Sequence, residues 1–142
     1  MEISVIRQRL MQSIDQRRRA AVERRQRTDA AAQAYETFLE RVATPIFKQF
    51  ANVLRSERLA FQVFTPGGGV RLASDRSGED FIELLLDVSG DVPAVLGRVR
   101  YARGSRVLSQ EAAMRPDREI AQLTEEDVLE FLLQGIQPLI ER

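Results

Sequence analysis

The first 43 residues contain neither proline nor glycine, and this absence constrains the fold more than any other feature of the chain. Residues 2–43 are instead rich in alanine, arginine, glutamine and glutamate, which favour helix. A helix from Ile3 to Val42 would measure about 60 Å at 1.5 Å per residue. A globule built from the remaining ~100 residues has a radius of gyration of only about 13 Å. We therefore expect segment 1–43 to extend, as an arm, beyond the globular part of its own chain.

The far end of this helix carries an apolar cluster that a monomer would leave exposed. Its members share one helical stripe and are Ile3, Ile6, Leu10 and Ile14. A second chain is the simplest cover for such a cluster, so we expect a homo-oligomer, with a twofold dimer favoured. The alternative is a break near Thr28, where Thr28 or Asp29 could cap a new helix and let the chain fold back on itself. The sequence leaves this choice open.

The seven-residue spacing typical of a coiled coil is present in the helix but imperfect. One seam reads Ile14, Ala21, Thr28, Tyr35 and Val42, whereas the companion seam contains Arg17 and Arg24. A buried, unpaired charge on a seam is costly. We therefore expect the apolar contacts between chains to concentrate at residues 3–14.

Residues 44–142 read as an α+β globular domain. Thr44-Pro45 predicts the start of a second helix, or a kink in the first, because proline favours the first helical turn. Short alternating segments with turns between them then predict a five-stranded antiparallel meander. The expected strands are Ala60–Phe64, Val70–Ser74, Asp80–Val88, Ala94–Ala102 and Arg106–Glu111. Thr124 is expected to cap a final helix that covers one face of the sheet.

The central strand Asp80–Val88 indicates which face of the sheet is covered. Alternation places one set of side chains toward the helices, namely Ile82, Leu84, Leu86 and Val88. The opposite set is mixed and predicts a partly wet outer face; it consists of Phe81, Glu83, Leu85 and Asp87. Arg98 and Arg100 are expected on this outer face, paired with acids.

Charge is balanced overall, with 21 basic and 21 acidic residues, but it is unevenly distributed. Residues 5–27 hold eight arginines against two acids, and residues 111–142 hold eight acids against three arginines. The arginines suggest a patch for an anion or an acidic partner, either a protein or a nucleic acid. Its candidate members are Arg17, Arg18, Arg24, Arg25, Arg98 and Arg100. The competing interpretation is ordinary solvated surface.

The sequence offers little for catalysis. Without cysteine or histidine there are no disulfides, Cys/His zinc sites or Ser-His triads. Residues Thr65–Gly69 form a glycine-rich loop, but a strand follows it instead of the helix that a phosphate site needs, so a hairpin turn is expected. Whether Gly67–Gly69 binds a ligand stays open. We expect no cofactor, no metal and no membrane span, and a cytoplasmic protein.

The function predicted from these observations is a small, non-enzymatic interaction or adaptor protein that self-associates through its N-terminal helix. One alternative is a nucleic-acid-associated protein that uses the arginine-rich helix, and another is a small-ligand-binding domain. The expected layout of long helix, meander and closing helix is similar to that of many small bacterial interaction modules, at the level of layout only.

Overall fold

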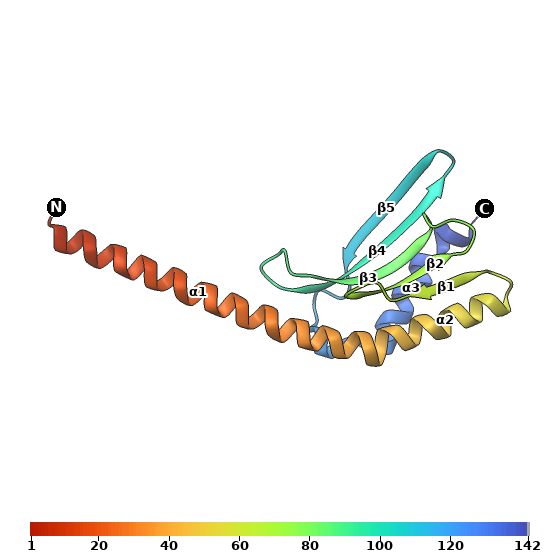
Figure 1. Cartoon of the computed structure of the whole chain (residues 1–142), viewed down its shortest axis with the longest axis horizontal. Coiled ribbons are helices and arrows are strands. Elements are labelled where there is room, and N and C mark those ends of the chain that lie inside the picture. Colours follow the sequence, from red (N-terminus) through yellow and green to blue (C-terminus); the bar gives the residue numbers. More distant parts are fainter. Residues whose placement is uncertain (142) are drawn as a thin grey trace.

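The computed structural model describes residues 1–141 and begins with unbroken helix from Ile3 to Ser56. Helix α1 (Ile3–Phe38) passes through a π-helical turn (Leu39–Ala43) into α2 (Thr44–Ser56). The expected long helix is therefore present, and the alternative of a fold-back near Thr28 is wrong. The sequence left open whether the second helix is separate or a kinked continuation, and the structure shows the continuation (Figure 1).

The change in helix direction has a local chemical cause. Pro45 lies in the first turn of α2 and has no N–H to donate to the preceding turn. The π turn comes directly before it, and such turns are a recognised cause of helix bends. Thr44 does not cap a new helix as expected, since its backbone is helical at φ −61° and ψ −46°. The helix widens for the single π turn and then continues as α2.

The five predicted strands are confirmed as an antiparallel meander in the spatial order β1-β2-β3-β4-β5. Their bounds are Phe61–Phe64, Gly69–Ser74, Phe81–Asp87, Ala94–Arg103 and Arg106–Ala113. The β4–β5 turn contains Gly104 at φ +61°, a conformation that favours glycine. The β4–β5 hairpin projects beyond the helices, and every residue of β5 is exposed (Figure 1).

Helices α2 and α3 (Glu125–Ile140) cover one face of the sheet (Figure 1), which confirms the predicted α+β fold. A short 3-10 helix (Ile120–Gln122) leads into α3. The core lies between these helices and the sheet. Its largest fully buried side chains are Phe47, Val70, Leu72, Ile82, Leu84, Val95, Val128 and Leu132.

The glycines Gly97 in β4 and Gly135 in α3 allow the helix to approach the sheet closely. A Cβ atom at Gly97 would lie 2.5 Å from Cε1 of Phe131, so the ring packs directly on the bare backbone of the strand. A Cβ atom at Gly135 would lie 3.0 Å from Cγ2 of Val99. These two contacts fix where α3 crosses the sheet.

The structure corrects the predicted faces of the central strand in two places. Val88 lies beyond the end of β3 and is 49% exposed instead of buried. On the outer face, Phe81 and Glu83 are buried, at 5% and 4% exposed. The guanidinium of Arg71 lies 4.1 Å from the centre of the Phe81 ring, so long arginine side chains shield this face in place of a second layer.

The helix joins the core before the end of segment 1–43. Tyr35, Phe38 and Ala43 are core residues, and the first helical residue packed against the core is Ala31. The free part of the helix is therefore shorter than the arm expected from the sequence. We use "the arm" below for residues 3–29, none of which belongs to the core or packs against it.

Candidate protein-interaction surfaces

The arm is the first candidate surface, because nothing in residues 1–141 covers its apolar side chains. Ile3 is 74% exposed, Ile6 51% and Leu10 57%, while Ile14 is partly buried. About 27 helical residues at 1.5 Å each carry the tip of the arm roughly 40 Å from the domain. In Figure 1 the arm runs straight away from the sheet and from α3. The four predicted contact residues thus lie together at its far end.

The middle of the arm carries the arginine stretch, defined here as residues 17–27. It contains Arg17, Arg18, Arg19, Arg24, Arg25 and Arg27, all exposed. Within the described chain, none of these six guanidinium groups forms an ion pair. Their positive charge is therefore available to a partner. Of the six, Arg17 and Arg24 lie on the continuation of the stripe that is apolar at residues 3–14, whereas Arg19 lies on the opposite side of the helix.

Arg98 and Arg100, the other two members of the predicted patch, lie in β4 on the outer sheet face. Figure 1 shows that β4 does not lie beside the arm. A row of alternating charge crosses the strands there, from Arg71 through Glu83 and Arg98 to Glu111. Arg98 donates to both carboxylates, at 2.9 Å to Glu83 and 2.7 Å to Glu111.

Partial burial alone would lower the pKa of Arg98, but its bonds to Glu111 and Glu83 outweigh this effect and raise the pKa. Arg100 lies 3.4 Å from Glu79. Both cations are therefore compensated within the chain, in contrast to the arginines of the arm.

The outward face of α3 is a second exposed surface, whereas the sequence predicted only that this helix covers one face of the sheet. Leu133 and Ile140 are 49% and 40% exposed. Together with the exposed Glu126 they form a row with seven-residue spacing along the helix. Glu125 and Glu130 flank the acidic end of this row. The signal in the sequence was the width of the apolar face of α3, which is more than one sheet can cover.

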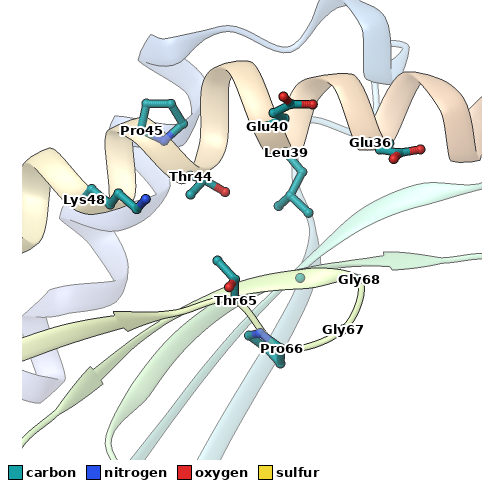
Figure 2. A pocket seen from close by; sticks show the side chains of 11 residues that line it. Glu36, Leu39, Glu40, Thr44, Pro45, Lys48, Thr65, Pro66, Gly67 and Gly68 are labelled. Carbon is teal, nitrogen blue, oxygen red and sulfur yellow. The ribbon is translucent and has the colours of Figure 1, made fainter.

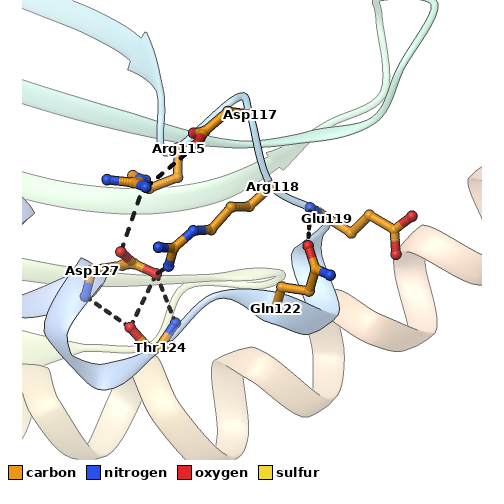
Figure 3. A network of polar contacts seen from close by, with 7 residues as sticks. All are labelled: Arg115, Asp117, Arg118, Glu119, Gln122, Thr124 and Asp127. Carbon is orange, nitrogen blue, oxygen red and sulfur yellow. Dashed lines mark hydrogen bonds and ion pairs between the residues drawn. The ribbon is translucent and has the colours of Figure 1, made fainter.

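A network around Asp127 holds the beginning of α3 in place. Thr124 caps the helix as predicted, with its hydroxyl accepting from the Asp127 backbone N–H at 3.2 Å. The buried Asp127 carboxylate in turn accepts from the Thr124 backbone N–H and from Arg118, both at 2.9 Å, while Arg115 lies 4.0 Å away (Figure 3).

Burial would raise the pKa of Asp127, but the Thr124 hydrogen bonds and the charges of Arg118 and Arg115 lower it below 3.8. The carboxylate therefore stays charged at neutral pH and fixes the connector after β5 to the first turn of α3. This anchoring sets the orientation of the α3 outer face.

The glycine-rich loop is a structural turn held by the long helix. The Tyr35 hydroxyl donates to the Gly68 carbonyl at 2.8 Å, and a Cβ atom at Gly69 would lie 2.7 Å from the Leu84 carbonyl oxygen. Burial and the charge of Glu83 raise the pKa of Tyr35 to about 12. An open groove of about 600 Å³ separates this loop from the π turn. Figure 2 shows Leu39 and Thr44 pointing across it toward the loop.

Neither a metal site nor a membrane-spanning helix is found in the described residues. Residues 1–141 contain no group of three or more acidic side chains placed to hold a metal ion. No helix in that range combines the length and the apolar character needed to cross a bilayer. Comparisons with models of protein families, with curated proteins and with solved structures each gave no match. Function must therefore be inferred from the residues of this chain.

Proposed function

We propose that this chain is a non-enzymatic assembly or adaptor protein of the cytoplasm that self-associates through its N-terminal arm. The observation that supports the proposal is the exposed apolar tip at the end of a rigid helix. Ile3, Ile6 and Leu10 are each more than half exposed, and burying one such side chain typically contributes about 1.5–3 kcal/mol. The unbroken helix keeps the tip away from its own core, so only a second molecule can cover it.

The pairing of charges on the outer face of the sheet also supports the proposal. Its arginines are neutralised by acids of the same chain, whereas those of the arm are not. Unpaired arginines and an exposed apolar cluster therefore occur together on the arm. A globular domain held at the end of a helical connector is a suitable architecture for placing two or more domains at a fixed separation.

The test is the mass of the native particle by light scattering. We expect wild type to exceed the monomer mass of 16.1 kDa, and the double variant Ile6→Glu/Leu10→Glu to return to it. Gln8→Glu/Gln12→Glu is a matched control, because it adds the same charge at the same spacing on the opposite side of the helix. A wild type that remains monomeric at high concentration would exclude self-association.

The arginine stretch supports nucleic-acid binding as a second candidate function. Six exposed arginines without ion pairs could neutralise phosphates, and such binding weakens steeply as salt is added. Fluorescence anisotropy with labelled duplex DNA and single-stranded RNA tests it. If Arg24→Gln/Arg25→Gln leaves any measured affinity unchanged, the arm is not the contact. No observation favours the ligand-binding alternative, because the glycine-rich loop is held by contacts within the chain.

A further inference from the structure

The order of apolar and basic residues along the arm determines what kind of surface could bind it. Along the interaction stripe, residues 3–14 are apolar and Arg17 and Arg18 follow directly. Two arms paired in parallel and in register would place Arg17 against its own copy, and like charges in contact are destabilising. A matching surface should instead be apolar opposite the tip and acidic opposite the arginines.

The outward face of α3 has this order of chemistry in reverse. Its N-terminal end is acidic, with Glu125 and Glu126, and its C-terminal end is apolar, with Leu133 and Ile140. The acids form no ion pair within residues 1–141, as is also true of the arm arginines. Apolar meets apolar and base meets acid only if the two helices run antiparallel.

The spacing of the two rows also agrees. Ile3, Leu10 and Arg17 are separated by seven residues, as are Glu126, Leu133 and Ile140. In one antiparallel register all three positions match. The opposed pairs are then Ile3 with Ile140, Leu10 with Leu133, and Arg17 with Glu126. Arg18 and Glu125 lie at the same level along the two helices in this register, on opposite flanks of the contact, and add to the basic and acidic ends of the two rows. A stretch of about 16 residues, roughly 24 Å long, carries the contact on each helix.

The contact has to be made between two molecules. Helix α1 is continuous, so its tip cannot turn back onto the α3 of its own chain (Figure 1). In a twofold dimer each arm would lie on the α3 helix of the other chain, and every pair would occur twice. Electrostatic matching of this kind selects partner and register more than it adds affinity.

We infer that the arm of one chain docks antiparallel on the outward face of α3 in a second copy, through the matched apolar and charged rows. This inference rests on the proposed self-association and specifies its binding surface. It also assigns a role to Leu133 and Ile140, which the core of their own chain leaves exposed. Residues 19–29 of each arm would bridge the gap between the two domains.

Cysteine crosslinking tests this contact directly, because the native chain has no cysteine. Leu10→Cys and Leu133→Cys are made as separate chains, mixed, and oxidised under mild conditions, and the disulfide-linked products are mapped by mass spectrometry. We expect the mixed 10–133 crosslink to dominate, since a disulfide requires Cα atoms within about 7 Å. A product dominated by 10–10 crosslinks would overturn the inference and leave self-association intact. A wild type that is monomeric by light scattering would exclude both.

A charge exchange gives an independent readout. Arg17→Glu/Arg18→Glu and Glu125→Arg/Glu126→Arg should each raise the dimer dissociation constant by roughly tenfold or more, and the four changes together should restore most of the affinity. Arg19→Glu is the matched control, because Arg19 lies on the opposite side of the arm and should have little effect. If the combined variant is no tighter than the two parents, the charged rows do not meet. Circular dichroism verifies that each variant is folded.

Discussion

Replacing Gly97 by alanine tests whether α3 lies where the structure places it. The new Cβ atom would lie 2.5 Å from Cε1 and 2.8 Å from Cζ of Phe131. Comfortable contacts between carbon atoms are about 3.5–4.0 Å, so the ring or the whole helix must move by about 1 Å. Overpacking of this size typically costs about 1–3 kcal/mol.

A smaller effect opposes this cost. Glycine in a strand is about 0.5–1 kcal/mol less favourable than alanine, because glycine loses more conformational freedom on folding. The two effects combine to a predicted loss of about 1–2 kcal/mol in the free energy of unfolding. Phe131→Leu removes the atoms nearest the new methyl group, so its combination with Gly97→Ala should lose less than the sum of the two single changes.

Urea unfolding followed by circular dichroism measures these free energies, provided that the m-value stays constant across the variants. Gly78→Ala is the control, since a Cβ atom there meets nothing within 4 Å. If Gly97→Ala proves as neutral as the control, or stabilises the protein, then α3 does not pack on β4 through Phe131 and the described core is incorrect.

Three further predictions concern charged and titrating groups. Glu83→Gln keeps the volume of a buried side chain but removes the charge between its two arginine partners. Urea unfolding should therefore show a loss of about 2 kcal/mol in the free energy of unfolding. A loss below about 0.5 kcal/mol would mean that the outer face is hydrated. The lowered pKa of Asp127 predicts stabilisation that is fully present above pH 3.8 and lost as pH falls through the folded pKa, and Asp127→Asn should remove this acid-dependent part. The raised pKa of Tyr35 predicts stability that is present below pH 10 and lost as pH rises toward about 12, which an ultraviolet absorbance titration compared with Tyr35→Phe can verify.

The sequence predicted the elements well, because each had a strong local signal. The absence of glycine and proline before Pro45 marked the long helix, and turns such as Arg103-Gly104-Ser105 marked the hairpins. The cap at Thr124 was also predictable, because threonine followed by acids satisfies the free amides of a helix start. These signals lie within a few residues of the structure that they determine.

The features that were missed depend on contacts distant in sequence. Alternation alone could not show that Glu83 is buried, because its cover comes from Arg71 and Arg98 on the neighbouring strands. Likewise, the sequence predicted that the final helix covers the sheet but not which side of the helix does so. Gly97 and Gly135 draw one side onto the sheet, and Leu133 stays exposed on another. The apolar tip and the arginines of the arm could be identified from the sequence. The α3 surface that complements them could be identified only from the structure.

The π turn at Leu39–Ala43 determines more than the bend of the helix. Unbroken helix from Ile3 to Ser56 transmits rotation, because each residue turns the chain by about 100°. The direction in which the arm leaves the domain is therefore determined by the packing of Phe38 and Phe47 on either side of the turn. One residue more or less in this turn would point the tip in another direction while leaving every side chain on the tip unchanged. Natural variation in the length of this turn would thus alter the geometry of an assembly without altering the residues in contact.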